Sequence, residues 1–271
     1  MASVVRHHLK SAEAGPALQA LSEWTPADAP GGGVHPGDLG WHFRFDDATA
    51  LLWTDDGAPV AAGFLDSGMI RVTVAPGTDA GAVAADAAEL LGSAGDRSDG
   101  LALPGWQPDP GEPWAVLSWN PRTVSTRAEP VGAATAADRV LVQRASFKNS
   151  TFSVERWHTM KRSPAGDRAV DVLVRTPSGE PAAAATGWFA GAGRCGLLEP
   201  VGTHPDHRGH GYGRDAVWGA CAALVDRGAS AVAVVTPADN VGAVALYRSA
   251  GFTLLRENLD WVPARPASPS P

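Results

Sequence analysis

The alternation of apolar and polar residues predicts two similar groups of strands and helices, one in each half of the chain. Residues 50–68 predict a strand, an Asp-Gly turn and a second strand, and residues 170–191 predict the same hairpin with Ser-Gly at the turn. Such dipeptides are typical of tight hairpin turns. In both halves a strand, a Pro-containing loop and a helix follow, at 69–91 and 195–225. This order indicates a tandem duplication; the alternative is a chance match, because strand–turn–strand–helix is a common succession.

The two halves differ after this shared part. Residues 229–258 predict an apolar strand, a helix that begins at Asn240, and a further strand opened by Gly251 and Phe252. Asn is favoured just before the first turn of a helix, because its side chain accepts a hydrogen bond from a first-turn amide. The first half lacks this strand–helix unit and leads to a single strand at 114–119. We therefore expect the first half to be a shortened copy.

The composition between the halves predicts a linker. Residues 125–140 are rich in Ala, Pro, Gly and Thr, which is typical of connecting segments, and we expect the linker at about 122–134. We expect one domain at residues 1–124 and a second at 135–262. The Pro- and Ser-rich segment 263–271 is expected to be a disordered tail.

Composition and charge exclude several classes of protein. The 271 residues carry a formal net charge of −7, which argues against nucleic acid as the partner. The two cysteines, Cys195 and Cys221, form no disulfide framework and are typical of a reducing compartment; each is expected to be a buried apolar residue. The N-terminus is charged where a signal peptide is apolar, and no stretch is long and apolar enough for a membrane span. We expect a cytoplasmic protein without a membrane partner.

The stretch VGTHPDHRGHGYGRD, from Val201 to Asp215, suggests a site for phosphate. Its glycines lie between a strand that is expected to end near Thr203 and a helix that is expected to begin near residues 209–213 and to run to about Asp226. Glycine lets a ligand approach the backbone, and the first-turn amides of a helix have no partner within the helix and lie at its positive end. This is neither a Walker A sequence nor the dinucleotide fingerprint, so by itself it is a weak signal.

A second motif makes the signal specific. The loop HPDHRGHGYG is followed, after a helix and an apolar strand, by NVGAVALYRSAGF. In this order the segment from Ala136 to Trp261 resembles the GNAT superfamily of acetyl-CoA-dependent N-acyltransferases. The resemblance implies an α/β (α+β) fold of two GNAT-like domains, each a mostly antiparallel mixed sheet flanked by helices, with the N-terminal one shortened and degenerate.

The resemblance also implies a set of site residues. The family's Q/R-x-x-G-x-G/A signature, which binds the pyrophosphate of coenzyme A, matches Arg208, Gly211 and Gly213. Tyr247 matches the residue that often protonates the departing thiolate. The residues expected to bind acetyl-CoA are Val201, Gly202, Thr203, Arg208, Gly209, His210, Gly211, Tyr212, Gly213, Arg214 and Asn240. Tyr247 could instead be only a packing residue.

The general base is less well defined. Alternation with a period of two places Glu199 on the same strand face as Val201 and Thr203, where a carboxylate can take a proton. A structural, salt-bridged Glu199 is an equal alternative. His204 and His207 flank the loop and are more simply explained as solvated residues. No metal is expected, because no His, Cys or Asp group has ligand spacing. Trp157 and Trp188 are candidates for contact with the acceptor, although aromatic residues are more often part of the core.

The first half is expected to have lost the cofactor site. Asp79 aligns with Arg208, and Gly81 is the single glycine where the second half has three. An acidic side chain repels a pyrophosphate. We therefore expect one cofactor molecule per chain.

These observations predict an N-acetyltransferase that moves the acetyl group of acetyl-CoA to a primary amine of a small molecule, in a monomer or homodimer. Four alternatives stay open: a protein amine as acceptor, a non-catalytic acetyl-CoA sensor, another acyl-CoA donor, and a nucleotide-binding protein. Retention of Tyr247 favours a catalyst over a sensor, and the lack of a loop lysine disfavours nucleotide binding.

Overall fold

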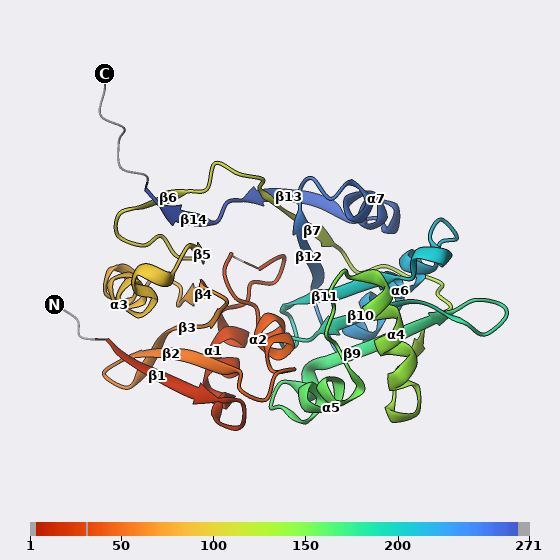
Figure 1. Ribbon diagram of the computed structural model, residues 1–271, viewed down its shortest axis with the longest axis horizontal. Coiled ribbons are helices and arrows are strands. Elements are labelled where there is room, and N and C mark those ends of the chain that lie inside the picture. Colours follow the sequence, from red (N-terminus) through yellow and green to blue (C-terminus); the bar gives the residue numbers. More distant parts are fainter. Residues whose placement is uncertain (1–3, 31, 265–271) are drawn as a thin grey trace, which may run out of the picture.

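The computed structural model describes residues 4–30 and 32–264, which form two mixed sheets with helices between and around them (Figure 1). The α-helices are α1 (Gly15–Trp24), α2 (Pro36–His42), α3 (Gly81–Leu91), α4 (Ala136–Ser146), α5 (Val154–Arg162), α6 (Tyr212–Asp226) and α7 (Val241–Ala250). The strands of the first sheet are β1 (Val5–Lys10), β2 (Thr49–Asp55), β3 (Ala58–Asp66), β4 (Met69–Val74), β5 (Arg97–Asp99), β14 (Trp261–Pro263) and β6 (Trp106–Pro108). Those of the second are β8 (Glu129–Pro130), β9 (Ala169–Arg175), β10 (Pro181–Trp188), β11 (Cys195–Thr203), β12 (Ala231–Pro237), β7 (Trp114–Trp119) and β13 (Thr253–Asn258).

The strand orders of the two sheets correspond position by position. The first runs β1-β2-β3-β4-β5-β14-β6, and the second, taken from its opposite edge, runs β8-β9-β10-β11-β12-β7-β13. In each sheet one internal pair is parallel, β4 with β5 and β11 with β12, and the other neighbours are antiparallel. The predicted fold class is thus confirmed, and the shared order supports the predicted duplication.

The hairpins form where their turn residues predict them. Asp56 and Gly57 between β2 and β3 both have positive φ, at 46° and 79°, as a two-residue turn between twisted strands requires. In the second half Gly179 has φ of 90° between β9 and β10. Both hairpins then lead through an internal strand to a helix, α3 or α6.

Each sheet contains one strand from the other half of the chain. Strand β7 was expected to end the first half, but it lies between β12 and β13 of the second sheet, and β14 lies between β5 and β6 of the first. A boundary between residues 124 and 135 therefore does not separate the two sheets. The apolar run of β7 predicts a buried strand, but its pattern does not determine which sheet it enters.

The strand–helix unit expected to be absent from the first half is only partly lost. Strands β5 and β6 occupy the positions of β12 and β13, but each has three residues. The residues 100–105 between them contain no helix in the structure, whereas α7 lies between β12 and β13. The first half is therefore shortened by the loss of a helix and by short strands.

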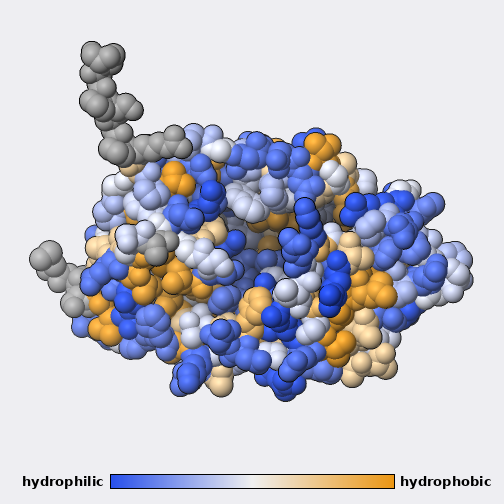
Figure 2. Space-filling model, in the orientation of Figure 1, coloured by the Kyte–Doolittle hydropathy of each residue, from blue (hydrophilic) through white to orange (hydrophobic). Residues whose placement is uncertain are grey.

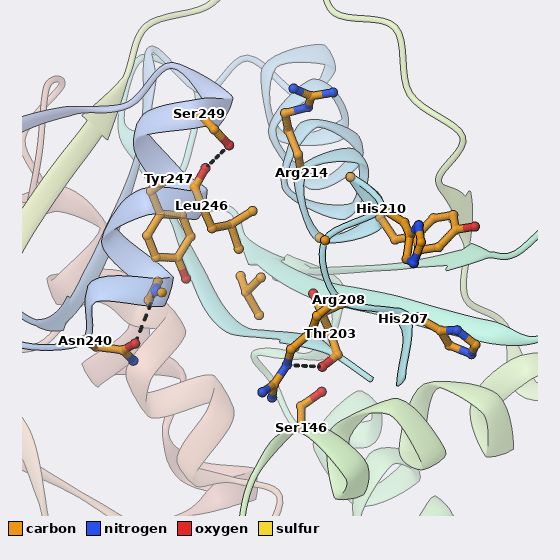
Figure 3. A pocket seen from close by; sticks show the side chains of 18 of the residues that line it. Ser146, Thr203, His207, Arg208, His210, Arg214, Asn240, Leu246, Tyr247 and Ser249 are labelled. Atoms are coloured by element: carbon orange, nitrogen blue, oxygen red, sulfur yellow. Dashed lines mark hydrogen bonds between the residues drawn. The ribbon is translucent and has the colours of Figure 1, made fainter. Parts of the chain in front are cut away.

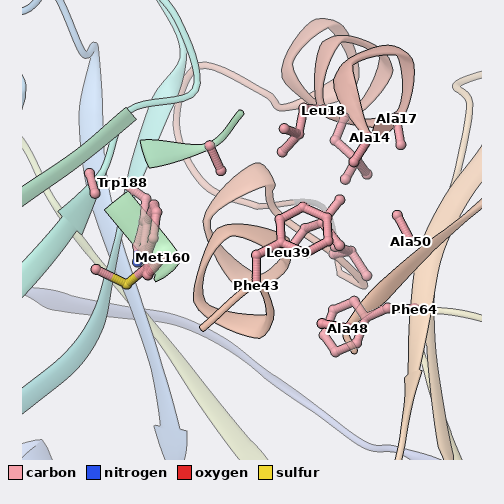
Figure 4. Packing of buried hydrophobic residues seen from close by; sticks show 14 of the residues in the cluster. Ala14, Ala17, Leu18, Leu39, Phe43, Ala48, Ala50, Phe64, Met160 and Trp188 are labelled. Atoms are coloured by element: carbon pink, nitrogen blue, oxygen red, sulfur yellow. The ribbon is translucent and has the colours of Figure 1, made fainter. Parts of the chain in front are cut away.

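The two halves share a hydrophobic core. Helices α1 and α2 lie between the sheets (Figure 4), and Leu39 and Phe43 of α2 belong to one buried cluster with Phe64 of β3 and Trp188 of β10. Gly37 and Gly40 of α2 lie so close to Trp188 that a Cβ atom on either would be 2.4–2.5 Å from its side chain. The first half thus packs directly on the sheet that carries the glycine loop.

The predicted tail at 263–271 lies almost wholly outside the described residues; Pro263 ends β14 and Ala264 follows it. Among residues 4–30 and 32–264, helices long and apolar enough to cross a membrane are absent.

Candidate active site

Strands β11 and β12 pair at one end and separate at the other. They pair at Cys195–Ala231, Gly196–Val232 and Leu197–Ala233, but β11 continues to Thr203 and β12 to Pro237. A cavity of about 480 Å³ lies in the gap, with residues 198–201 on one side and 234–237 on the other. Beyond Leu197 this edge of β11 offers backbone groups to a ligand in the gap.

The three glycines of the loop have different structural roles. Gly209 and Gly211 have φ of 82° and 83°, which other residues rarely adopt, and a Cβ atom on Gly209 would meet no described atom within 4 Å. Gly213 instead lies within α6, which begins at Tyr212, and its Cβ would be 2.6 Å from Oγ1 of Thr203. Gly213 therefore allows α6 to pack closely on β11, which differs from the ligand access expected from sequence.

The loop and α7 form the walls of a cavity of about 780 Å³ (Figure 3). Tyr247 and Asn240 come from the α7 side, and Arg208 and Thr203 come from the loop and the end of β11. All eleven residues expected to bind acetyl-CoA line this cavity, as does Tyr247: Val201, Gly202, Thr203, Arg208, Gly209, His210, Gly211, Tyr212, Gly213, Arg214 and Asn240. Their role in binding stays a prediction.

The donors of this cavity suit a diphosphate. Arg208 and Arg214 line it, and Asn240, the predicted first residue of α7, accepts a hydrogen bond from Ala243 N through Oδ1 at 3.1 Å, which leaves its amide nitrogen as a donor. The first-turn amides of α6 lie beside Gly211, at the positive end of the helix. The residues present thus fit the phosphates of coenzyme A.

Sequence reasoning missed two features of this cavity. Arg127, within the predicted linker, lies beside Gly211: its Nη2 would be 4.0 Å from a Cβ atom added to that glycine. Arg127 also forms an ion pair with Asp215 of α6. Ser146 and Phe147, at the end of α4, lie against Gly202, where a Cβ would be 2.7 Å from Oγ of Ser146. Neither the basic residue in the linker nor the end of α4 belongs to a sequence motif. The sequence alone therefore could not predict that they lie at this site.

Tyr247 lies where the loop cavity and the gap meet. It is 6% exposed and lines both the loop cavity and the gap between β11 and β12. Burial, and then the neighbouring Cys221 and Glu199, raise the pKa of Tyr247 above its usual range. The phenol therefore keeps its proton at neutral pH, as a general acid must.

Glu199 lies on the other side of the gap, at a β-bulge. Ala185 pairs with Val201 and Gly187 with Leu198, so Glu199 and Pro200 together oppose Thr186. The predicted shared face of Glu199, Val201 and Thr203 is therefore wrong. Val201 packs with the cluster on the α6 side, whereas Glu199 lines a cavity with residues of α2 on the opposite side of the sheet.

A third cavity, of about 170 Å³, adjoins Glu199 and lies between the two halves. Asp38 of α2 lines it beside Glu199 and accepts a hydrogen bond from His35 N at 2.7 Å. Burial, and then the Glu199 carboxylate, raise the pKa of Asp38 to about 8. Asp38 therefore keeps its proton at neutral pH. Asp38 was not predicted from sequence, because nothing in its own half connects it to Glu199.

Both candidate tryptophans are core residues, as aromatic residues more often are. Trp157 is 5% exposed and Trp188 is fully buried, both in the core between the halves. Trp188 instead donates a hydrogen bond from Nε1 to the backbone oxygen of Glu199 at 2.6 Å, and so helps to hold the bulge. The aromatic residues that line the gap and the third cavity include Trp41 and Trp114.

The histidines and cysteines have the roles expected of them. His204 accepts a hydrogen bond from Asp206 N at 3.3 Å within the loop, and His207 lines the loop cavity, away from Glu199. Cys195 and Cys221 are free and buried, and burial raises the pKa of Cys195 to about 12. Neither thiol is therefore a nucleophile at neutral pH.

Comparisons with known proteins identify a family and a fold. The model of the "Acetyltransferase (GNAT) family" matches residues 141–252. The chain is similar in structure to a tandem GNAT protein from the clavulanic acid biosynthesis pathway, solved without acetyl-CoA (TM-score 0.58, 15% identity, covering 99% of this chain and 100% of that one). It is also similar to a GNAT-family acetyltransferase from Colwellia psychrerythraea (TM-score 0.58, 13% identity, covering 95% and 98%). A search of curated proteins found no match.

The fold, the loop and the family match together define an acyltransferase. Residues 141–252 form a domain of the GNAT family, and the whole chain has the fold of a tandem GNAT protein. The solved relatives are under 25% identical, so they show the fold alone. Members of this family generally use acetyl-CoA.

Proposed function

We propose that the protein is an N-acetyltransferase that binds acetyl-CoA in its second half and transfers the acetyl group to a primary amine of a small molecule. The observation that carries this proposal is the continuity of the three cavities. Val201, Asn240 and Tyr247 line both the loop cavity and the gap, and Leu198, Glu199 and Val235 line both the gap and the third cavity. A thioester placed in the gap would meet an amine from the third cavity.

The chain's residues would supply positioning and two proton transfers. Acetyl-CoA supplies the activated acetyl group; the amine nitrogen forms a bond to its carbonyl carbon, and the carbon–sulfur bond breaks. The loop and Arg208 hold the phosphates, and holding both reactants in line supplies much of the rate enhancement. The Asp38–Glu199 pair takes the proton that the ammonium group must lose, and Tyr247 donates the proton that the departing sulfur takes up.

The third cavity favours a small acceptor over a protein amine. It is walled by both halves, with α2, β4 and β5 on one side and β7, β11, β12 and β13 on the other. Figure 2 shows this face of the molecule hollowed near its middle. A small amine fits an enclosed space of this kind, whereas a lysine on a protein surface needs an open groove.

Turnover of free amines tests the proposal. The protein is incubated with acetyl-CoA and a panel of primary amines, thiol release is followed, and each product mass is checked for one added acetyl group. We expect thiol release that depends on both the amine and the protein. Tight binding of acetyl-CoA in calorimetry without turnover of any amine would support the sensor alternative instead.

A further inference from the structure

The third cavity contains charges of both signs, contributed by both halves. Its acidic residues are Asp38, Asp99, Glu199 and Asp260, and its basic residues are Arg71 and Arg256. His35 also lines it, but burial lowers the pKa of His35 to about 4, and its Nδ1 accepts a hydrogen bond from Gly37 N. His35 is therefore neutral and contributes no charge.

Two of the four acidic residues are already neutralised in part. Asp260 binds Arg97, from outside the cavity, at 3.1 Å and accepts a hydrogen bond from Nε1 of Trp114 at 3.1 Å. Asp38 keeps its proton at neutral pH, because burial and the Glu199 carboxylate raise its pKa to about 8. Negative charge then remains on Asp99, on Glu199 and in part on Asp260, whose partner Arg97 also binds Asp109 at 2.8 Å, against the positive charges of Arg71 and Arg256. The cavity therefore offers charges of both signs to a ligand.

Both arginines have donors to spare. The carboxylate nearest Arg71 is that of Asp99, with 3.7 Å between Nη1 and Oδ2, which is too long for a hydrogen bond. Arg256 donates to the backbone oxygen of Pro30 and to Asn258, and within the described part of the chain it has no ion-pair partner. Guanidinium groups with free donors at a cavity wall are well suited to bind a carboxylate.

A carboxylate oxygen of the same cavity also has no partner. Oε2 of Glu199 is buried, and among residues 4–30 and 32–264 it accepts no hydrogen bond. A buried acceptor without a partner is costly unless a ligand satisfies it. An ammonium group is such a ligand, and Glu199 is also the residue that faces the gap.

We infer that the acceptor is a small aminocarboxylate, a zwitterion whose ammonium group lies at Glu199 and Asp38 and whose carboxylate lies at Arg71 and Arg256. This inference rests on the proposed function and names its substrate class. A zwitterion matches a cavity that has charges of both signs, whereas a simple alkylamine leaves both guanidinium groups without a partner. The cavity, of about 170 Å³, has room for a small amino acid.

The test compares each acceptor with its own carboxamide. The amine panel contains small α-, β- and γ-amino acids, each paired with the carboxamide of the same length, which keeps the amine and removes only the charge of the carboxylate. For at least one pair we expect kcat/KM to be at least tenfold higher for the aminocarboxylate, through a lower KM. In R71Q and R256Q that ratio should fall towards one, because only the aminocarboxylate loses a partner for its carboxylate.

The carboxamide activity reports whether each variant is folded, and R248Q, on an exposed residue of α7 outside the three cavities, is the matched control. Carboxamides that react as well as or better than every aminocarboxylate, or arginine variants that slow both members of a pair equally, would overturn the inference and leave the proposed function standing. An absence of turnover with every amine would overturn both.

Discussion

In each half a strand leads through a loop to a helix, a segment that we call the corner. Only the second corner leaves room for an anion. In the second half β11 leads to α6 through Arg208, Gly209 and Gly211, whose loop lines a large cavity. In the first half β4 leads to α3, and Oδ1 of Asp79 accepts a hydrogen bond from the first helical amide, Gly81 N, at 2.9 Å. The first-turn amides of a helix can bind an anion only when no side chain of the preceding loop already accepts their hydrogen bonds. In the first half Asp79 does so.

The halves differ again in the elements that come after the corner helix. In the second half α7 crosses between β12 and β13 and brings Tyr247 to the gap. In the first half residues 100–105 form a loop between two strands of three residues. The first half has instead become a wall of the third cavity, to which it contributes Asp38, Arg71 and Asp99.

The largest expected effect comes from the helix that only the second half has. Tyr247→Phe should lower kcat by about 10²–10⁴-fold, the usual contribution of a general acid or base, while the affinity for acetyl-CoA stays nearly unchanged. The Phe ring keeps the packing against Phe252. Steady-state kinetics and calorimetry measure the two quantities. Full activity in this variant, with chemistry rate-limiting, would make Tyr247 a packing residue.

A charge reversal at the loop of the second half should weaken binding, whereas a charge reversal at the corresponding loop of the first half should not. Arg208→Glu should raise the dissociation constant for acetyl-CoA by about tenfold to a hundredfold, because it replaces a charge-assisted donor with a like charge. Gly211→Val should also weaken binding, because a β-branched residue is strained at a φ of 83°. Asp79→Lys, on the first corner, is the matched control, and its affinity should equal that of the wild type in calorimetry.

The number of acetyl-CoA molecules bound per chain tests directly whether the first half has a cofactor site. We expect one acetyl-CoA per chain in calorimetry, because Asp79 occupies the first corner. Two equivalents would mean that the first half also binds the cofactor.

The carboxyl pair between the halves predicts a pH dependence of stability. The folded-state pKa of Asp38, about 8, lies above the usual 3.8, so the folded protein binds more protons than the unfolded chain between these values. The protonated Asp38 side chain therefore makes its whole contribution to the free energy of unfolding below about pH 4, and this contribution is lost as the pH rises through about 8. Asp38→Asn should gain stability relative to the wild type over this range in denaturant unfolding. Asp47→Asn, on an exposed residue, is the control, and a constant difference across the range would contradict the assignment.

The smallest effect is expected at the closed corner. Asp79→Ala removes the side-chain acceptor for Gly81 N and should lower the free energy of unfolding by about 0.5–1 kcal/mol, as for the loss of other helix-start hydrogen bonds. It should leave the affinity for acetyl-CoA unchanged. A gain of a second binding site in this variant would show that Asp79 alone closes the corner.

Local sequence signals predicted the parts of the site that lie within one segment. Glycines at positive φ, an Asn at the start of α7 and a Tyr on that helix are properties of neighbouring residues, so the residues predicted from them all line the loop cavity. Turn dipeptides and apolar alternation likewise predicted the hairpins and the helix after each.

The tertiary structure decided what depends on contacts between distant segments. The exchange of β7 and β14 reflects which sheet offers each strand an open position, and no local pattern encodes that choice. The bulge at Glu199 turns its side chain away from the face that alternation predicts. Asp38 and Glu199 meet only because α2 packs on β10 and β11 across the interface. The sequence determined the glycine loop because it is local, whereas the third cavity exists only once the two halves are packed together.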